Sequence, residues 1–272
     1  ENPIDPLKVF NTIELGPETK IYIPKLLFPI KESKIPKRFN PRTILSGAYN
    51  FQQRSDYTRY ITNISFGYEW KESAYKTHIL NPIDLSAVYL DNRSRILDSV
   101  ITNAFIRNSF TNHFTTATKY SFIYSNQELH KKVSFSYFRT NIEIAGNLLR
   151  ATSKIFNSPL DTTNNSYLIF GIKYAQYIRI DMDWRRYIYL NRHSTLAMRF
   201  LSGLGLPYEN SSAMPFERSF FSGGANDMRA WQARNLGAGS FQGPAKFDQI
   251  GDIKLGANLE SRFEFISVFV GA

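Results

Sequence analysis

The sequence has no cysteine among its 272 residues. This absence excludes a disulfide-bonded scaffold, a zinc site built from thiolates and a thiol nucleophile. Long hydrophobic runs are also missing, because no window approaches the ~18 consecutive apolar residues that a membrane helix needs. The longest apolar stretches, such as Leu26 to Ile30, are short and broken by proline. A bundle of transmembrane helices is therefore excluded.

Catalytic motifs are scarce as well. No His-Glu-x-x-His metal motif and no Gly-x-Ser-x-Gly nucleophile elbow occurs, and Gly203-Leu204-Gly205 lacks the following glycine and helix of a phosphate loop. The four histidines are dispersed without metal-ligand spacing; they are His78, His113, His130 and His193. We therefore predict no catalytic residue, no metal site and no cofactor.

The charge balance is basic. There are 33 Lys and Arg residues against 23 Asp and Glu, a formal net charge of +10. This excess would suit nucleic acid or an anionic membrane surface. The basic residues are scattered among acidic ones, and no helix is predicted that could enter a groove, so nucleic acid is not expected as a partner. Contact with anionic lipid head groups explains the excess better.

Aromatic residues are abundant, with 22 Phe, 16 Tyr and 3 Trp in a chain whose mean hydropathy is −0.31. Many of them fall at alternate positions. Between Arg59 and Lys71 the even positions are mostly aromatic or apolar; they are Tyr60, Thr62, Ile64, Phe66, Tyr68 and Trp70. The odd positions are mostly polar or charged. A period of two predicts a β-strand with two different faces.

The same alternation recurs at residues 45–52, 119–125, 132–137, 195–204 and 252–265. Several runs exceed the ~5–6 residues of a strand in a soluble sheet and match the ~9–11 residues with which a tilted barrel strand crosses a bilayer. Residues 152–165 and 205–249, which break the pattern, predict long loops. The fold class predicted is all-β.

Two architectures fit long amphipathic strands. In a soluble sandwich the apolar face points into a core, whereas in a membrane barrel it faces lipid and the polar face lines a lumen. The length of the strands, the Tyr and Trp residues near their ends and the charges on the polar faces favour a transmembrane antiparallel β-barrel. The wet face of a soluble sheet would also accommodate those charges, so the sandwich stays open at this point.

The two ends of the chain suggest a fragment. Glu1 to Pro6 carry neither a basic nor an apolar region of a secretory signal, and Ser267 to Ala272 read as a strand still in progress. We expect residues 1–272 to be a barrel domain that is truncated at both ends.

One segment, Pro215 to Trp231, breaks the alternation in a distinctive way. Two bulky residues, Phe220 and Phe221, precede Gly223 and Gly224, whose backbone is free to adopt positive φ. Met228, Arg229, Ala230 and Trp231 follow. The pattern predicts a structured loop that aims the Arg229 guanidinium at a carboxylate, although an ordinary turn and a surface arginine would give the same residues.

This segment resembles the lid loop of the BamA/TamA outer-membrane assembly superfamily, in which an aromatic-Gly-Gly stretch leads into an Arg-Gly-aromatic motif. Ala230 stands where glycine is usual. With Leu236 to Ser240 the segment looks most like the BamA/TamL-type proteins of Bacteroidota. The stretches Tyr68 to Trp70, His78 to Pro82, Ala145 to Asn147 and Gly251 to Lys254 support the resemblance, which runs over about residues 40–270.

The resemblance implies a fragment of a sixteen-stranded barrel in the outer membrane of a Gram-negative cell, with residues 205–249 as a lid folded into the lumen. It implies that Arg229 pairs with an acidic lumen group, and Glu260 occupies the matching strand position. Glu260 also falls at the polar parity of its strand.

The implied function is non-enzymatic insertion or translocation of proteins at the outer membrane, through a barrel that can open. The implied partners are outer-membrane lipid, client outer-membrane proteins, periplasmic POTRA domains of the same full-length chain and accessory lipoproteins. The alternative is a polypeptide secretion porter or a passive channel of the same superfamily. An enzymatic barrel with a Ser-His pair has no support in the sequence.

Overall fold

The protein is described by a computed structural model that covers residues 12–27, 39–54, 58–91, 112–128, 131–155, 160–161, 166–169, 171–237 and 249–264. Its main element is one antiparallel sheet of ten strands. These strands are β1 (Thr12–Leu15), β2 (Glu18–Ile23), β3 (Arg42–Arg54), β4 (Thr58–Lys71), β5 (Lys76–Asp91), β6 (His113–Ser125), β7 (Phe135–Ala145), β11 (Tyr177–Asn191), β12 (Ser194–Pro207) and β13 (Ile253–Phe263). Residues 265–272, where the sequence predicts a continuing strand, lie outside the described residues.

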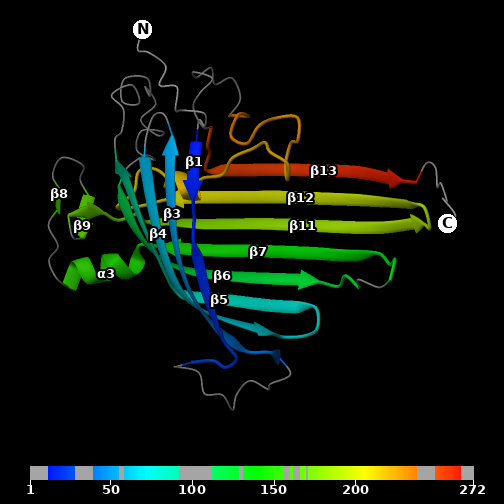
Figure 1. Ribbon diagram of the computed structural model, residues 1–272, viewed down its shortest axis with the longest axis horizontal. Coiled ribbons are helices and arrows are strands. Elements are labelled where there is room, and N and C mark those ends of the chain that lie inside the picture. Colours follow the sequence, from blue (N-terminus) through cyan, green and yellow to red (C-terminus); the bar gives the residue numbers. More distant parts are fainter. Residues whose placement is uncertain are drawn as a thin grey trace, which may run out of the picture.

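The strands follow one another around a curled sheet in the order β1, β3, β4, β5, β6, β7, β11, β12, β13, as Figure 1 shows. Each long strand is antiparallel to the next, so the sheet is an up-and-down meander. Two short strands lie side by side with β3 at the first edge of the sheet. β1 pairs with Phe51–Arg54 of β3, and β2 pairs with Thr43–Ala48 of the same strand. In the described part of the chain, β1 and β2 form one edge of the sheet and β13 forms the other.

The two faces of the sheet differ as the alternation predicts. Residues that are paired across an antiparallel ladder point to the same face, so the registers assign every strand residue to a side. One face carries the charged and polar side chains. The other carries apolar side chains that are exposed; they include Ile64, Ile180, Trp184, Phe200, Leu255 and Leu259. One cluster of buried apolar residues lies among the described residues, and it is small: Ala117, Ala145, Ala175, Tyr177 and Met214.

This distribution is the reverse of a soluble sandwich. Leu255 and Leu259 are each 73% exposed, yet neither lies at an end of the 11-residue strand β13. A soluble sheet would have to cover such a face with a second layer, whereas lipid covers it in a membrane barrel. The all-β, antiparallel prediction is confirmed, and the exposed apolar face favours the barrel over the sandwich.

The connections at the two ends of the sheet differ in length. Residues 92–112, 146–176 and 208–252 join strands at one end, whereas residues 72–75, 126–134 and 192–193 join strands at the other. The short connection between β3 and β4 at the first end and the segment between β2 and β3 at the second are the exceptions. In bacterial outer-membrane barrels the long connections are extracellular loops and the short ones are periplasmic turns.

The connection between β7 and β11 forms a small cap. It contains helix α3 (Asn147–Ile155) and a second sheet of β8 (Leu160–Asp161), β9 (Ser166–Ile169) and β10 (Ile172–Lys173). The prediction of a loop beginning at Thr152 is therefore wrong, because Thr152 lies within α3 and the helix packs on β6 and β9. No helix in the described residues is long and apolar enough to cross a membrane.

Candidate functional site

The candidate site lies where the segment between β12 and β13 covers the polar face of the sheet. We call residues 208–252 the β12–β13 connection; the structure describes residues 208–237 and 249–252 of it. It begins three residues later than the predicted loop, because β12 continues to Pro207. Ala238 to Ser240, part of the motif that supports the resemblance, lie outside the described residues.

The connection is anchored by a short 3-10 helix, η3 (Phe216–Arg218). The backbone N–H groups of Arg218 and Ser219 both donate to the carbonyl of Pro215, at 2.9 and 3.0 Å. Phe216 is 1% exposed, and its ring lies beneath two guanidinium groups, with Arg59 at 5.0 Å and Arg234 at 4.6 Å from the ring centroid. Such cation–π contacts strengthen when they are removed from water.

Arg218 points into an acidic part of the polar face. Its Nε lies 3.6 Å from Glu143 on β7, and its Nη2 lies 3.8 Å from Asp84 on β5. Lys119 on β6 joins both carboxylates, at 2.7 Å from Asp84 and 3.8 Å from Glu143. The Tyr177 hydroxyl donates to Glu143 at 2.6 Å. Burial is the largest single influence and lowers the pKa of Arg218, but Glu143, Tyr177, Asp84 and Glu217 together outweigh it and raise that pKa above its usual value.

Glu217 points the other way along the same face. Its carboxylate accepts a hydrogen bond from Arg59 on β4 at 2.7 Å and lies 3.5 Å from His113 on β6. Arg59 also donates to Gln52 on β3 at 2.6 Å. The two charged side chains of one helical turn therefore reach side chains of β4, β5, β6 and β7. A flat sheet could not bring these strands around three residues, so the curl of the sheet creates the site.

Phe220 is the second anchor. It is 8% exposed and lies against Gly203 of β12, where a Cβ atom would sit 2.5 Å from the ring. The Arg179 guanidinium lies 4.3 Å from the ring centroid. The backbone of Phe220 exchanges two hydrogen bonds of 2.8 Å with Gly251, which ties the start of the connection to its end. Phe221 is 39% exposed, and its carbonyl accepts a hydrogen bond from Lys254.

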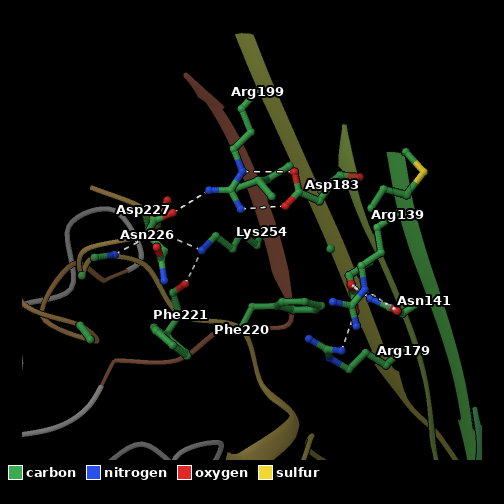
Figure 2. A pocket seen from close by; sticks show the side chains of 18 of the residues that line it. Arg139, Asn141, Arg179, Asp183, Arg199, Phe220, Phe221, Asn226, Asp227 and Lys254 are labelled. Atoms are coloured by element: carbon green, nitrogen blue, oxygen red, sulfur yellow. Dashed lines mark hydrogen bonds and ion pairs between the residues drawn. The ribbon is translucent and has the colours of Figure 1, made fainter. Parts of the chain in front are cut away.

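A cavity of about 620 Å³ lies between residues 220–227 of the β12–β13 connection and the polar face of β7, β11 and β12, which we call the wall (Figure 2). Arg199 reaches into it and donates to Asp183 at 2.8 Å and to the Asn226 carbonyl at 2.6 Å. Lys254 forms an ion pair with Asp227 at 2.9 Å. The wall and the connection are thus joined by charge-assisted hydrogen bonds from Arg199 and Lys254. Among the described residues, no group of three or more His, Cys, Asp or Glu side chains could hold a metal ion.

The predicted motif residues divide into two groups. Gly223 and Gly224 have φ values of 92° and 96°, and a Cβ on Gly223 would sit 2.3 Å from the Gln232 carbonyl oxygen, so this tight turn needs glycine. By contrast, the segment from Met228 to Trp231, which includes Arg229 and Ala230, is exposed. Met228 is 48% exposed and Trp231 is 49% exposed.

Glu260 lies on the polar face, but its carboxylate binds Arg262 on the same strand at 2.9 Å. Arg229 and Glu260 line the same cavity of about 650 Å³, and no direct ion pair joins them among the described residues. Arg218, Glu217 and Glu143 were not predicted as site residues from the sequence. The available signal was local: Arg218 directly precedes Ser219 and the Phe220-Phe221 pair, and Glu143 falls at the polar parity of β7.

The Omp85 superfamily domain matches residues 33–271. The chain belongs to the Omp85 superfamily. No curated protein matches it. Omp85 proteins are β-barrels of the outer membrane of Gram-negative bacteria, so the described strands are part of such a barrel, with the apolar face toward lipid and the polar face toward the lumen. At the level of the superfamily the function is insertion or translocation of proteins at that membrane, with lipid and client proteins as partners and without enzymatic chemistry.

Proposed function

We propose that the chain is the barrel of an outer-membrane protein assembly factor of the BamA/TamA type, and that the β12–β13 connection is a lid that stays in the lumen while the barrel works. The observation that carries this proposal is the attachment of η3. Phe216, Glu217 and Arg218 contact side chains of four neighbouring strands through ring contacts and ion pairs that are buried or partly buried.

An attached lid decides between two routes for a client protein. Passage through the lumen would require Arg218 and Glu217 to leave their partners, and an unpaired charge in a buried position is costly. Assembly at an opened edge requires no such step, because an edge strand offers free N–H and C=O groups to a client strand by β-augmentation. The attached lid therefore favours assembly, in which it holds the register of the barrel wall while the wall opens.

The exposed segment from Met228 to Trp231, which we call the tip of the lid, supplies a second contact in this proposal. Arg229 and Glu260 share one cavity, and we propose that they pair when the lid closes further against β13. The POTRA domains of the full-length chain and accessory lipoproteins would deliver clients from the periplasm. The similarity to Bacteroidota BamA/TamL-type proteins, which rests on the Arg229-Ala230-Trp231 form, belongs to the same proposal.

A covalent bridge between the lid and the wall tests the proposal. Asp227 and Lys254 lie 2.9 Å apart at their charged atoms, and the chain has no native cysteine. The variant Asp227→Cys/Lys254→Cys, bridged with a short dithiol-reactive reagent in the full-length protein, should still fold client barrels in vesicles at a rate within twofold of the unbridged protein. The two single-cysteine variants, treated with the same reagent, are the controls.

The alternative, a secretion porter or passive channel, is supported by the polar cavity between the connection and the wall. A porter predicts that the bridge blocks transport of a polypeptide into the vesicles. It also predicts that photo-crosslinkers at the lumen positions Asn258 and Arg185 capture the client. If the bridge stops client folding, or if clients crosslink mainly to these positions, the assembly proposal is wrong.

A further inference from the structure

The lipid-facing side of the sheet carries one arginine in an unusual position. Arg186 on β11 lies opposite Ser136 on β7 and Met198 on β12, and these three residues share the apolar face. In the described part of the ten-stranded sheet, every other outward-facing Asp, Glu, Lys or Arg is the first or last residue of its strand; these are Lys76 and Asp91 of β5. Arg186 alone projects from a strand interior.

Among the residues that the structure describes, no acidic side chain pairs with Arg186. Its Nη1 donates to the Ser136 hydroxyl at 2.7 Å, and this is the only polar contact that the described residues give to its side chain. The neighbouring Arg185 provides the contrast. It points to the lumen, where its Nε and Nη2 bind Asp183 at 3.0 and 2.6 Å. β7 and β12 flank β11 on both sides, and the residues that they place opposite Arg186 are uncharged.

The depth of Arg186 follows from its neighbours. Two residues earlier, Trp184 lies opposite Phe138 and Phe200, and Trp184 is 41% exposed on the same face. Trp184 is the eighth of the fifteen residues of β11, and the apolar Ile188 and Leu190 lie beyond Arg186 on the same face. Arg186 is one step closer to the short turn at residues 192–193, at the end that the connection lengths assign to the periplasm. From the interior of a strand, the long stem of an arginine can run along the apolar surface and bring its charge toward the head groups of that leaflet.

We propose that Arg186 binds the phosphate group of a phospholipid in the periplasmic leaflet. The guanidinium is a fixed fork of donors that matches the oxygens of a phosphate. The Ser136 hydroxyl occupies Nη1 and orients the fork, which leaves Nε and Nη2 for the lipid. Trp184 and Met198 lie beside the same site and face the acyl chains. The proposal requires only that the apolar face meets lipid, and it holds for an assembly factor and for a porter alike.

Lipid retention by the full-length protein tests this site. The protein is reconstituted in nanodiscs of phosphate-free digalactosyldiacylglycerol that contain a small fraction of dioleoylphosphatidylglycerol, and the lipids retained per chain are counted by native mass spectrometry. The unmodified protein should retain one more phosphatidylglycerol than Arg186→Gln. Arg186→Lys, which keeps the charge but loses the fork, should retain it several-fold more weakly. Arg192→Gln, which removes an arginine from the adjacent turn, should behave as the unmodified protein.

Each of the following results would contradict the proposal. Equal retention by Arg186→Gln and the unmodified protein would show that Arg186 holds no lipid. If Arg186→Gln does not fold, the comparison of the unmodified protein with Arg186→Lys tests the site instead. An unmodified protein that retains no phosphatidylglycerol would contradict the proposal. Displacement of the lipid by inorganic phosphate would show a site for a soluble anion instead. Equal retention of lipid A in place of phosphatidylglycerol would contradict the assignment to the periplasmic leaflet.

Discussion

The base and the tip of the β12–β13 connection contain the same kind of side chain in opposite surroundings. At the base, Arg218 lies between the carboxylates of Asp84 and Glu143. At the tip, Arg229 is exposed and shares a cavity with Glu260 without a direct ion pair. Both arginines have aromatic residues nearby in the sequence. The strands that curl around a guanidinium, and not its sequence neighbours, determine how firmly it is held.

The largest effect should come from removing the carboxylate that the base depends on. Glu143→Ala leaves Arg218 and Lys119 without one of their partners and leaves the Tyr177 hydroxyl without an acceptor. Breaking a buried ion pair by removing one partner costs about 3–5 kcal/mol. The free energy of unfolding in urea, measured in lipid vesicles, should fall by that amount.

Glu18→Ala is the control for Glu143→Ala, since Glu18 is a half-exposed acidic residue of β2 whose ion pair among the described residues is with Lys20. It should leave the urea midpoint unchanged. A loss below ~1 kcal/mol for Glu143→Ala, the range of exposed ion pairs, would contradict the assignment of Glu143 to the anchor.

A smaller effect should follow from crowding the second anchor. In Gly203→Ala the new Cβ would lie 2.5 Å from the Phe220 ring, so the ring must move and the contact with Arg179 is disturbed. Overpacking of this kind costs about 1–3 kcal/mol. Gly47→Ala on β3 is the matched control, because nothing lies within 4 Å of the added atom. Alanine there should stabilise the strand by about 0.5–1 kcal/mol. Equal urea midpoints for the two variants would show that Phe220 is not packed against Gly203.

The smallest effect is expected at the tip. Arg229→Glu and Glu260→Arg should each shift the urea midpoint less than Gly203→Ala does, because both side chains are exposed and salt screens their interaction. If the two groups pair when the lid closes, the double variant restores the midpoint and the client-folding rate of the unmodified protein. A double variant that restores neither shows that the tip carries no clamp.

Much of the sheet could be predicted from local sequence, because the side chains of a strand alternate whatever the strand pairs with. The alternation at residues 59–71 and 195–204 corresponds to β4 and β12. β11 was missed although Ile178, Ile180 and Met182 alternate with charged residues. The adjacent Arg185 and Arg186 interrupt the pattern there, since one faces Asp183 and the other faces lipid.

The cap and the anchor could not be predicted in the same way. α3 has nine residues, too few to be stable alone, and it depends on its contacts with β6 and β9. The choice of Arg218 as an anchor depends on Glu143 and Asp84, which come from two other strands. Local sequence identifies a packed loop, but the pairing partners of its charges are set by the curl of the sheet.

The division of the first edge into β1 and β2 has a consequence for how that edge loosens. Gly16 and Pro17 separate the two strands, and Pro17 has no N–H to add to the ladder, although its carbonyl accepts a hydrogen bond from Tyr49. The amides of Ile13 and Leu15 should therefore become exposed by a different local unfolding event from the amides of Ile21 and Ile23. Hydrogen exchange should proceed at this edge in two separate steps, each breaking a short ladder, while β4 to β7 still protect their amides.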